Sequence, residues 1–153
     1  ADAVEGIGGW DEQRPFNQDY DLIARVLMEG GDVAFGRHKC TRVRCRKDSI
    51  SADWGKDERT AQAELDRDIL RHLRDRETPE ERVAAVEDAV FLKLRRLYQF
   101  DPETAVRLHQ ETFPGGYAPS TDGGNTAAYC TAYRVMGFPA AERLKTLLQK
   151  VRS

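Results

Sequence analysis

The stretch TPEERVAAVEDAVFLKLRRLYQFDPET, residues 78–104, decides the fold class because it holds the clearest helix signals in the chain. Thr78 and Glu81 have the spacing of a capping box, and Pro79 stands where a helix tolerates proline because its first N–H groups have no partner. The apolar residues that follow recur every three or four positions, which predicts a helix to about Tyr98. Its core-facing residues would be Val83, Val86, Val90, Leu94 and Leu97.

The same helical spacing extends outward in both directions. Asp101 and Pro102 repeat the start signal and open a shorter predicted helix. The triplet Gly137-Phe138-Pro139 predicts a break before the last helix, because glycine, an apolar residue and proline commonly end one. The predicted helices are 19–29, 57–76, 79–98, 102–112, a helix that starts at Asn125 or Thr126 and runs to Met136, and 139–151. The helix at 139–151 is expected to point four apolar side chains toward the core: Leu144, Leu147, Leu148 and Val151.

One region departs from this period. In TRVRCR, residues 41–46, arginine alternates with Thr, Val and Cys, and alternation by two is the pattern of a strand. Residues 33–54 therefore predict a β-hairpin. The expected fold is α+β and mostly α-helical, with about five helices packed around a small antiparallel β-hairpin. Residues 1–18 are expected to be an N-terminal arm, and residues 19–153 a single α-rich domain.

Composition narrows the class of protein. The chain has 153 residues and a formal net charge of -2, but residues 37–47 alone carry +6 and no acid. No apolar run is long enough to cross a bilayer, and the start lacks a signal-peptide pattern. Three cysteines are too few for a disulfide scaffold. We therefore expect a cytoplasmic protein of a bacterium or phage, with no membrane partner, no cofactor and a possible homodimer.

The basic segment is the first candidate site. Three arginines on one face of a strand would repeat every ~6.6–6.8 Å, close to the spacing of phosphates along an extended strand. Such a stripe can bind nucleic acid or an acidic protein, and it can also be a solvated strand edge protected by charge. The candidate binding residues are Arg37, Lys39, Arg42, Arg44, Arg46 and Lys47.

The thiols offer a weaker alternative. His38, Cys40 and Cys130 include the ligand types that zinc accepts in tetrahedral sites. The five-residue separation of Cys40 from Cys45 directs these two side chains to opposite faces of a continuous strand. Such a site would therefore need a bulge or a distant partner, and buried structural thiols are the competing interpretation.

The segment RDILRH, residues 67–72, resembles the R-x4-6-H signature of HEPN-type ribonucleases. In that all-α family the arginine and histidine act together on the RNA phosphodiester, so the resemblance would make Arg67 and His72 catalytic. It covers six residues. A separation of five places the two side chains ~140° apart on a regular helix, which does not favour joint action within one copy. Solvated helix charge is the other interpretation.

A second enzyme candidate lies further along the chain. His109 precedes the loop FPGGYAPSTDGG, residues 113–124, which contains Tyr117 and ends at a helix start. Long loops commonly bind ligands or partners, so we count Tyr117 among the binding residues and His109 among the catalytic candidates. Our leading hypothesis is a small non-catalytic binding or regulatory protein that uses the basic hairpin. The alternative is a small enzyme, HEPN-like or another hydrolase, that uses a histidine near this loop.

Overall fold

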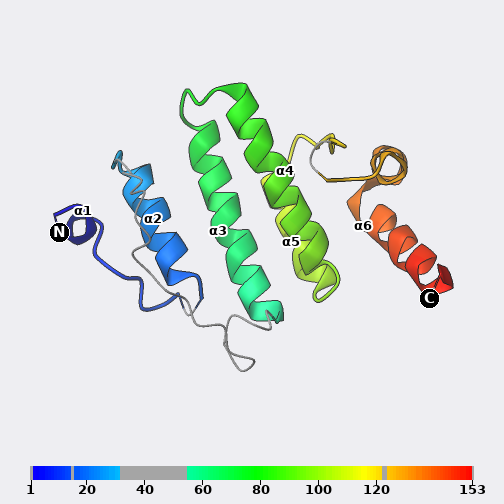
Figure 1. Cartoon of the computed structure of the whole chain (residues 1–153), viewed down its shortest axis with the longest axis horizontal. Helices are drawn as coiled ribbons and strands as arrows, with labels where there is room; N and C mark the ends of the chain where they lie inside the picture. The colour runs from blue at the N-terminus through cyan, green and yellow to red at the C-terminus, as the bar shows by residue number, and fades with distance from the viewer. Residues whose placement is uncertain (1, 15, 32–54, 122–123, 153) are drawn as a thin grey trace, which may run out of the picture. The chain divides into compact units, whose positions relative to one another are not determined.

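The computed structural model describes residues 2–14, 16–31, 55–121 and 124–152, and six helices account for most of them. Figure 1 shows these helices in chain order. Their bounds are α1 Asp2–Gly6, α2 Gln18–Met28, α3 Lys56–Arg74, α4 Glu80–Leu97, α5 Pro102–Thr112 and α6 Ala127–Arg152. No described helix is both long and apolar enough to cross a membrane.

The predicted α+β class is wrong, because the described residues form helices and contain no strand. The hydrophobic core consists of side chains from helices and their connections, so the apolar faces cover one another without a sheet as a second layer. The hairpin was predicted at 33–54, and this range lies outside the described residues. The helical period therefore accounts for the whole described fold.

The chain divides into two units, residues 1–62 and residues 63–153. In the first unit, Arg25 of α2 holds the segment that follows α1. Its guanidinium donates to the carbonyl oxygens of Ile7 and Gly9 at 2.9 and 2.7 Å and to the Asp21 carboxylate at 2.8 Å. Asp21 also pairs with Arg14 at 3.2 Å. The residues of α2 that are buried are Asp21 and Ala24, so a polar network links α2 to the segment after α1 in the described part of this unit.

The second unit is built around the ring of Phe91 on α4, which is 0% exposed. Rings from α5, α6 and the connection between them surround it at centroid distances of 4.7–6.3 Å, mostly edge-on or tilted, as aromatic pairs prefer. They belong to His109, Phe113, Tyr117, Tyr129, Tyr133 and Phe138. The face predicted for α4 is confirmed: Val90, Leu94 and Leu97 are buried, and Val83 and Val86 pack against this core.

The two predicted helix starts have different outcomes. The cap of α5 is confirmed, because Asp101 accepts a hydrogen bond from the Thr104 amide at 3.2 Å and Pro102 follows it. The capping box of α4 is wrong. That helix begins at Glu80 with Pro79 as its N-cap and without a side-chain cap, so Thr78 lies one residue too early to reach the free amides.

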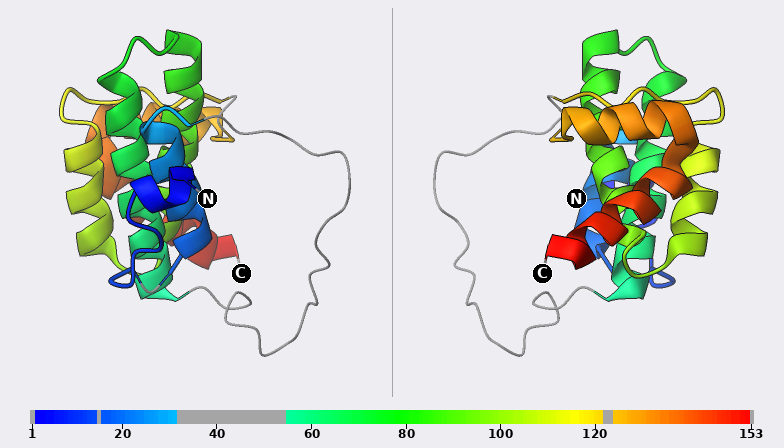
Figure 2. Two further views of the ribbon diagram at one scale, coloured as in Figure 1. Left: turned by 90° about the vertical axis from the view of Figure 1, so that its left-hand side faces the viewer. Right: turned by 90° about the vertical axis from the view of Figure 1, so that its right-hand side faces the viewer.

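The predicted break in the last helix is confirmed at Gly137. This residue has φ 77° and ψ 175° inside α6, a backbone conformation that glycine adopts without strain, and Pro139 follows it. Figure 2 shows the bend that results between the two arms of α6. The predicted start is confirmed as well, because the Thr126 hydroxyl accepts from the Tyr129 amide at 3.2 Å, directly before the helix begins.

Arg95 of α4 fixes both arms of α6. Its guanidinium lies 3.5 Å from the centre of the Tyr129 ring on the first arm, a cation–π contact. It pairs at 2.6 Å with Glu142 on the second arm, and it also donates to the side chain of Asn125. Glu142 is buried and has a second cation, Lys145, at 3.3 Å. The bend in α6 is therefore held by charge that is shielded from water.

Candidate functional site

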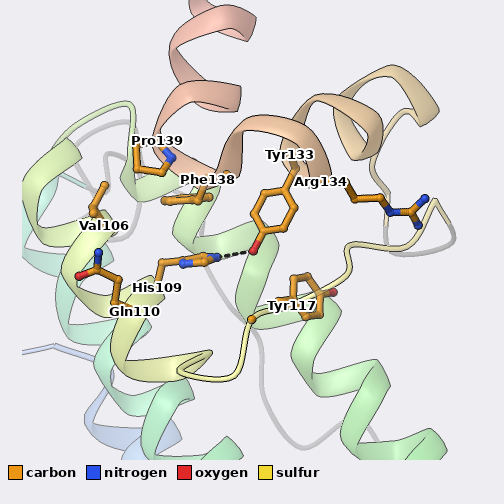
Figure 3. Close-up of a pocket in the computed structure, with 10 residues that line it drawn as sticks. Val106, His109, Gln110, Tyr117, Tyr133, Arg134, Phe138 and Pro139 are labelled. Atoms are coloured by element: carbon orange, nitrogen blue, oxygen red, sulfur yellow. Dashed lines mark hydrogen bonds between the residues drawn. The ribbon is translucent and has the colours of Figure 1, made fainter.

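A hollow of about 440 Å³ opens between α5 and α6, within the range of about 300–1,000 Å³ typical of small-ligand pockets. Figure 3 shows the residues that line it. They come from α5, from the connection that follows it, and from both sides of the bend in α6. They are Val106, His109, Gln110, Gly116, Tyr117, Tyr133, Arg134, Gly137, Phe138 and Pro139. We call this hollow the His109 groove.

Local sequence explains how these side chains meet. Val106, His109 and Gln110 are three and four residues apart on α5, so they share one face of that helix. Tyr133 lies one turn before Gly137, and the bend at this glycine brings Phe138 against the His109 ring. The groove thus depends on two local features, one helix face and one glycine-directed bend.

His109 lies at the centre of the groove. Its Nε2 shares a 2.9 Å hydrogen bond with the Tyr133 hydroxyl, drawn as the dashed line in Figure 3. Its ring stacks on Phe138, with the ring centres 4.4 Å apart and the planes 7° from parallel. Burial lowers the pKa of His109 from 6.5 to about 4, because the apolar surroundings disfavour the charged imidazolium. The imidazole is therefore neutral near pH 7.

The two tyrosines of the groove are also held in their neutral forms. The Tyr117 hydroxyl donates a hydrogen bond to the Asp88 carboxylate of α4. Burial raises the pKa of Tyr117 far above its ordinary value, and the charge of Asp88 raises it further. Burial also raises the pKa of Tyr133 to about 12. Neither phenol is therefore ionised at neutral pH, and both hydroxyls already have partners inside the protein.

A second hollow, of about 490 Å³, adjoins the first along α5. The two share Val106, Gln110 and Pro139, so their apolar floor is continuous. Arg134 lines the first hollow. Arg143, Arg107 and one acid, Glu103, line the second, and Arg107 is paired with Glu64 and Glu111, so we consider Arg134 and Arg143. Within the described ranges neither arginine has a carboxylate partner, so positive charge is available along the edge of an apolar surface.

The structure brings together two of the residues singled out from sequence, His109 and Tyr117, which both line the groove. Arg67 and His72 lie on α3 and line neither hollow. The Arg67 guanidinium is already engaged by Asp68 at 3.0 Å and by Glu111 at 2.6 Å. A role for Arg67 in catalysis would first require these two carboxylates to release it.

Most of the remaining predicted site residues lie outside the part of the chain that the structure describes. The basic stripe of Arg37, Lys39, Arg42, Arg44, Arg46 and Lys47 lies outside the described residues, as do the candidate ligands His38 and Cys40. Cys130 is a free, buried thiol on α6. The part of the chain that the structure describes contains no group of three or more His, Cys, Asp or Glu side chains placed to hold a metal ion.

Sequence reasoning missed Gln110, Arg134 and Phe138 as groove residues. The spacing of Val106, His109 and Gln110 was a usable signal for one side of the groove, because it places them on one helix face. The other side had no such signal, because it depends on the direction in which α6 turns at Gly137. No protein-family model, curated protein or solved structure matches the chain, so the chemistry of the groove itself carries the interpretation.

Proposed function

We propose that this chain is a non-catalytic binding protein for an acidic protein partner, and that the His109 groove accepts an apolar or aromatic side chain of that partner. The observation that carries the proposal is the state of His109. Its Nε2 is bonded to Tyr133 and its ring is stacked on Phe138, so it serves as part of the groove wall.

The same arrangement argues against acid–base chemistry in the groove. A general acid or base works best when its pKa lies near the working pH, and burial moves the pKa of His109 down to about 4. Tyr117 and Tyr133 are shifted in the opposite direction, away from neutrality. The hydroxyl of Tyr117 is also committed to Asp88. These polar groups therefore support the shape of the groove and do not provide a proton donor or acceptor suited to pH 7.

The charge at the edge of the groove selects the partner. Arg134 and Arg143 flank an apolar floor, and arginine pairs with carboxylates through two parallel hydrogen bonds. An apolar side chain with acidic neighbours in its own sequence would meet both features at once. A phosphate backbone would meet only the arginines, so the groove favours an acidic protein over a nucleic acid.

Two short peptides test this proposal. We expect the capped tripeptide Glu-Phe-Glu to shift the amide NMR signals of α5 and α6 around the groove, and its Lys-Phe-Lys counterpart to leave them unchanged. Arg134→Ala should weaken binding of the acidic peptide about fivefold, since a solvent-exposed ion pair contributes at most about 1 kcal/mol. Arg96→Ala, which removes an exposed arginine of α4 outside the groove, is the matched control.

Gln110→Trp should obstruct the groove at an exposed position without disturbing the core, and abolish the shifts. Equal binding of both peptides would disprove the charge selection. Shifts that persist in Gln110→Trp would place the peptide elsewhere on the protein and overturn the assignment of this groove.

A second candidate function, nucleic-acid binding, is favoured by the sequence of residues 37–47, with six basic residues and no acid. Anisotropy of labelled DNA and RNA at ~50 and ~200 mM salt tests it, because phosphate contacts weaken steeply with salt. Loss of binding in the folded Arg42→Ala, Arg44→Ala, Arg46→Ala variant would support the stripe. No binding of wild type at ~50 mM salt would reject this function.

A further inference from the structure

The second arm of α6 presents a row of leucines to solvent. Leu147 and Leu148 are 61% and 52% exposed, and Leu144 is also exposed. Their spacing of three and four places them on one helix face. We predicted these three side chains to point inward, and that prediction is wrong, because the second arm extends past the elements that form the core. An exposed leucine row on one helix commonly marks an interaction surface.

Basic residues border this leucine row. Residues 143–152 contain four basic side chains and no acid. Arg143 and Lys150 are exposed, and they lie on the same side of the leucine face because they are seven residues apart. The neighbouring acid, Glu142, is buried beside Arg95 and contributes no negative charge to the surface. The face is therefore apolar at its centre and positively charged around it.

The first unit presents a face of opposite charge. Tyr20, Ile23 and Leu27 of α2 are exposed, with Ile23 at 52%, and their spacing of three and four places them together. Residues 1–31 contain seven acids and two bases, which is a net charge of -5. Both bases, Arg14 and Arg25, are paired with Asp21. Asp19 lies four residues before Ile23 and borders this row, so the α2 face combines an exposed apolar row with a segment of net negative charge.

We propose that the leucine face of α6 docks on the α2 face of a second copy of this chain. Either face paired with its own copy would place like charges around an apolar contact, four bases against four or a net -5 against -5. The pairing of α6 with α2 matches charge and buries both apolar rows. Because each copy carries both faces, two such contacts related by a twofold axis make a closed dimer.

Sedimentation equilibrium of the full chain over ~1–200 μM tests this, since that range spans dimers of moderate affinity. We expect wild type to approach twice its 17.3 kDa mass. The double variant Leu147→Glu, Leu148→Glu should remain monomeric, and so should Ile23→Arg. Val135→Glu is the matched control, because Val135 is 79% exposed on the first arm of α6, outside the leucine row, and its variant should dimerise normally.

Charge exchange then identifies which faces meet. Reversal of Arg143 and Lys150 to Glu should weaken dimerisation at least tenfold, and reversal of Asp19 and Glu29 to Lys should do the same. A mixture of the two reversed proteins in equal amounts should restore a closed dimer, because the reversed α6 face of one chain meets the reversed α2 face of the other, and the two unreversed faces also meet. All four reversals in one chain should restore it, since every contact is matched again.

Three results would overturn the proposal. Wild type that stays monomeric at the highest concentration rules out self-association through these faces. Dimers that survive Ile23→Arg but not the α6 double variant would place α6 against α6. Failure of the four-reversal chain to recover, with circular dichroism showing that it is folded, would remove the charge complementarity. The α6 double variant and Ile23→Arg change no residue that lines the His109 groove or the adjoining hollow, so their result stands apart from that of the peptide experiment.

Discussion

The two units of this chain are stabilised by different physics. The second surrounds Phe91 with aromatic rings from α5, α6 and the segment between them, and these surfaces are removed from water. The first has Asp21 and Ala24 as the buried residues of α2 and uses one arginine to tie two backbone carbonyls to that helix. Apolar burial contributes free energy in proportion to area, whereas a polar network contributes through a small number of hydrogen bonds that act locally. We therefore expect the units to respond very differently to substitution.

The largest effect should come from the centre of the second unit. Phe91→Ala should lower the free energy of unfolding by about 3–5 kcal/mol, because it removes a fully buried ring and leaves a cavity among its neighbours. Urea denaturation followed by circular dichroism measures this. The control is Phe100→Ala, an exposed ring just past α4, which should cost less than about 0.5 kcal/mol. Similar losses for both would show that the ring cluster is not the main source of stability.

A smaller and more local effect should follow in the first unit. Arg25→Leu removes the two bonds to the carbonyl oxygens of Ile7 and Gly9 and one of the two cations beside Asp21. Bonds to charged groups contribute about 1.5–3 kcal/mol, so amide exchange at residues 7–9 should accelerate by at least tenfold. Exchange in the core of α4 should stay unchanged. Acceleration in α4 as well would show that the two units unfold together.

The smallest effect is a dependence on pH that belongs to the second unit. The pKa of His109 is about 4 when folded and 6.5 ordinarily, so the unfolded chain takes up the proton first. Stability is therefore full above pH 6.5 and declines as the pH falls toward 4. Between pH 7 and 5 the loss should be about 1–2 kcal/mol, reduced for the partial exposure of the ring.

The control for this pH dependence is His109→Gln, which keeps a hydrogen-bonding group for Tyr133 but does not titrate. Its free energy of unfolding should change less than that of wild type between the same two pH values. Urea denaturation at pH 7 and 5 compares them. An equal change in both proteins would assign the pH dependence to carboxyl groups elsewhere in the chain.

Sequence predicted much of the helical framework because its signals are local. The cap at Asp101, the helix start after Thr126 and the break at Gly137 depend on residues within one turn of each other, and all three are confirmed. The capping box predicted at Thr78 is wrong by one residue, because the N-cap is Pro79, and this shift takes the Thr78 side chain out of reach of the free amides. The predicted α+β class is wrong because it was inferred from one short segment, residues 41–46, in which arginine alternates with other residues.

The groove was only half predictable. The sequence pointed to His109, which precedes a long loop, and to Tyr117 within that loop, and both residues line the groove. Their partners are distant in sequence: Tyr133 lies 24 residues from His109, and Asp88 lies 29 from Tyr117. Periodicity identifies which face of a helix is apolar, but it does not identify what covers that face. This is why Leu147 was expected inside and is exposed.

Local sequence is sufficient to place α5, the body of α4 and the bend in α6, because hydrogen bonds and backbone preferences within a few residues decide these features. Tertiary structure alone decided that Arg95 would hold both arms of α6 and that burial would keep His109 neutral. It also decided that one leucine row would remain uncovered. Each of these outcomes depends on which distant surface removes water from a side chain, and burial of that kind is a property of the assembled fold.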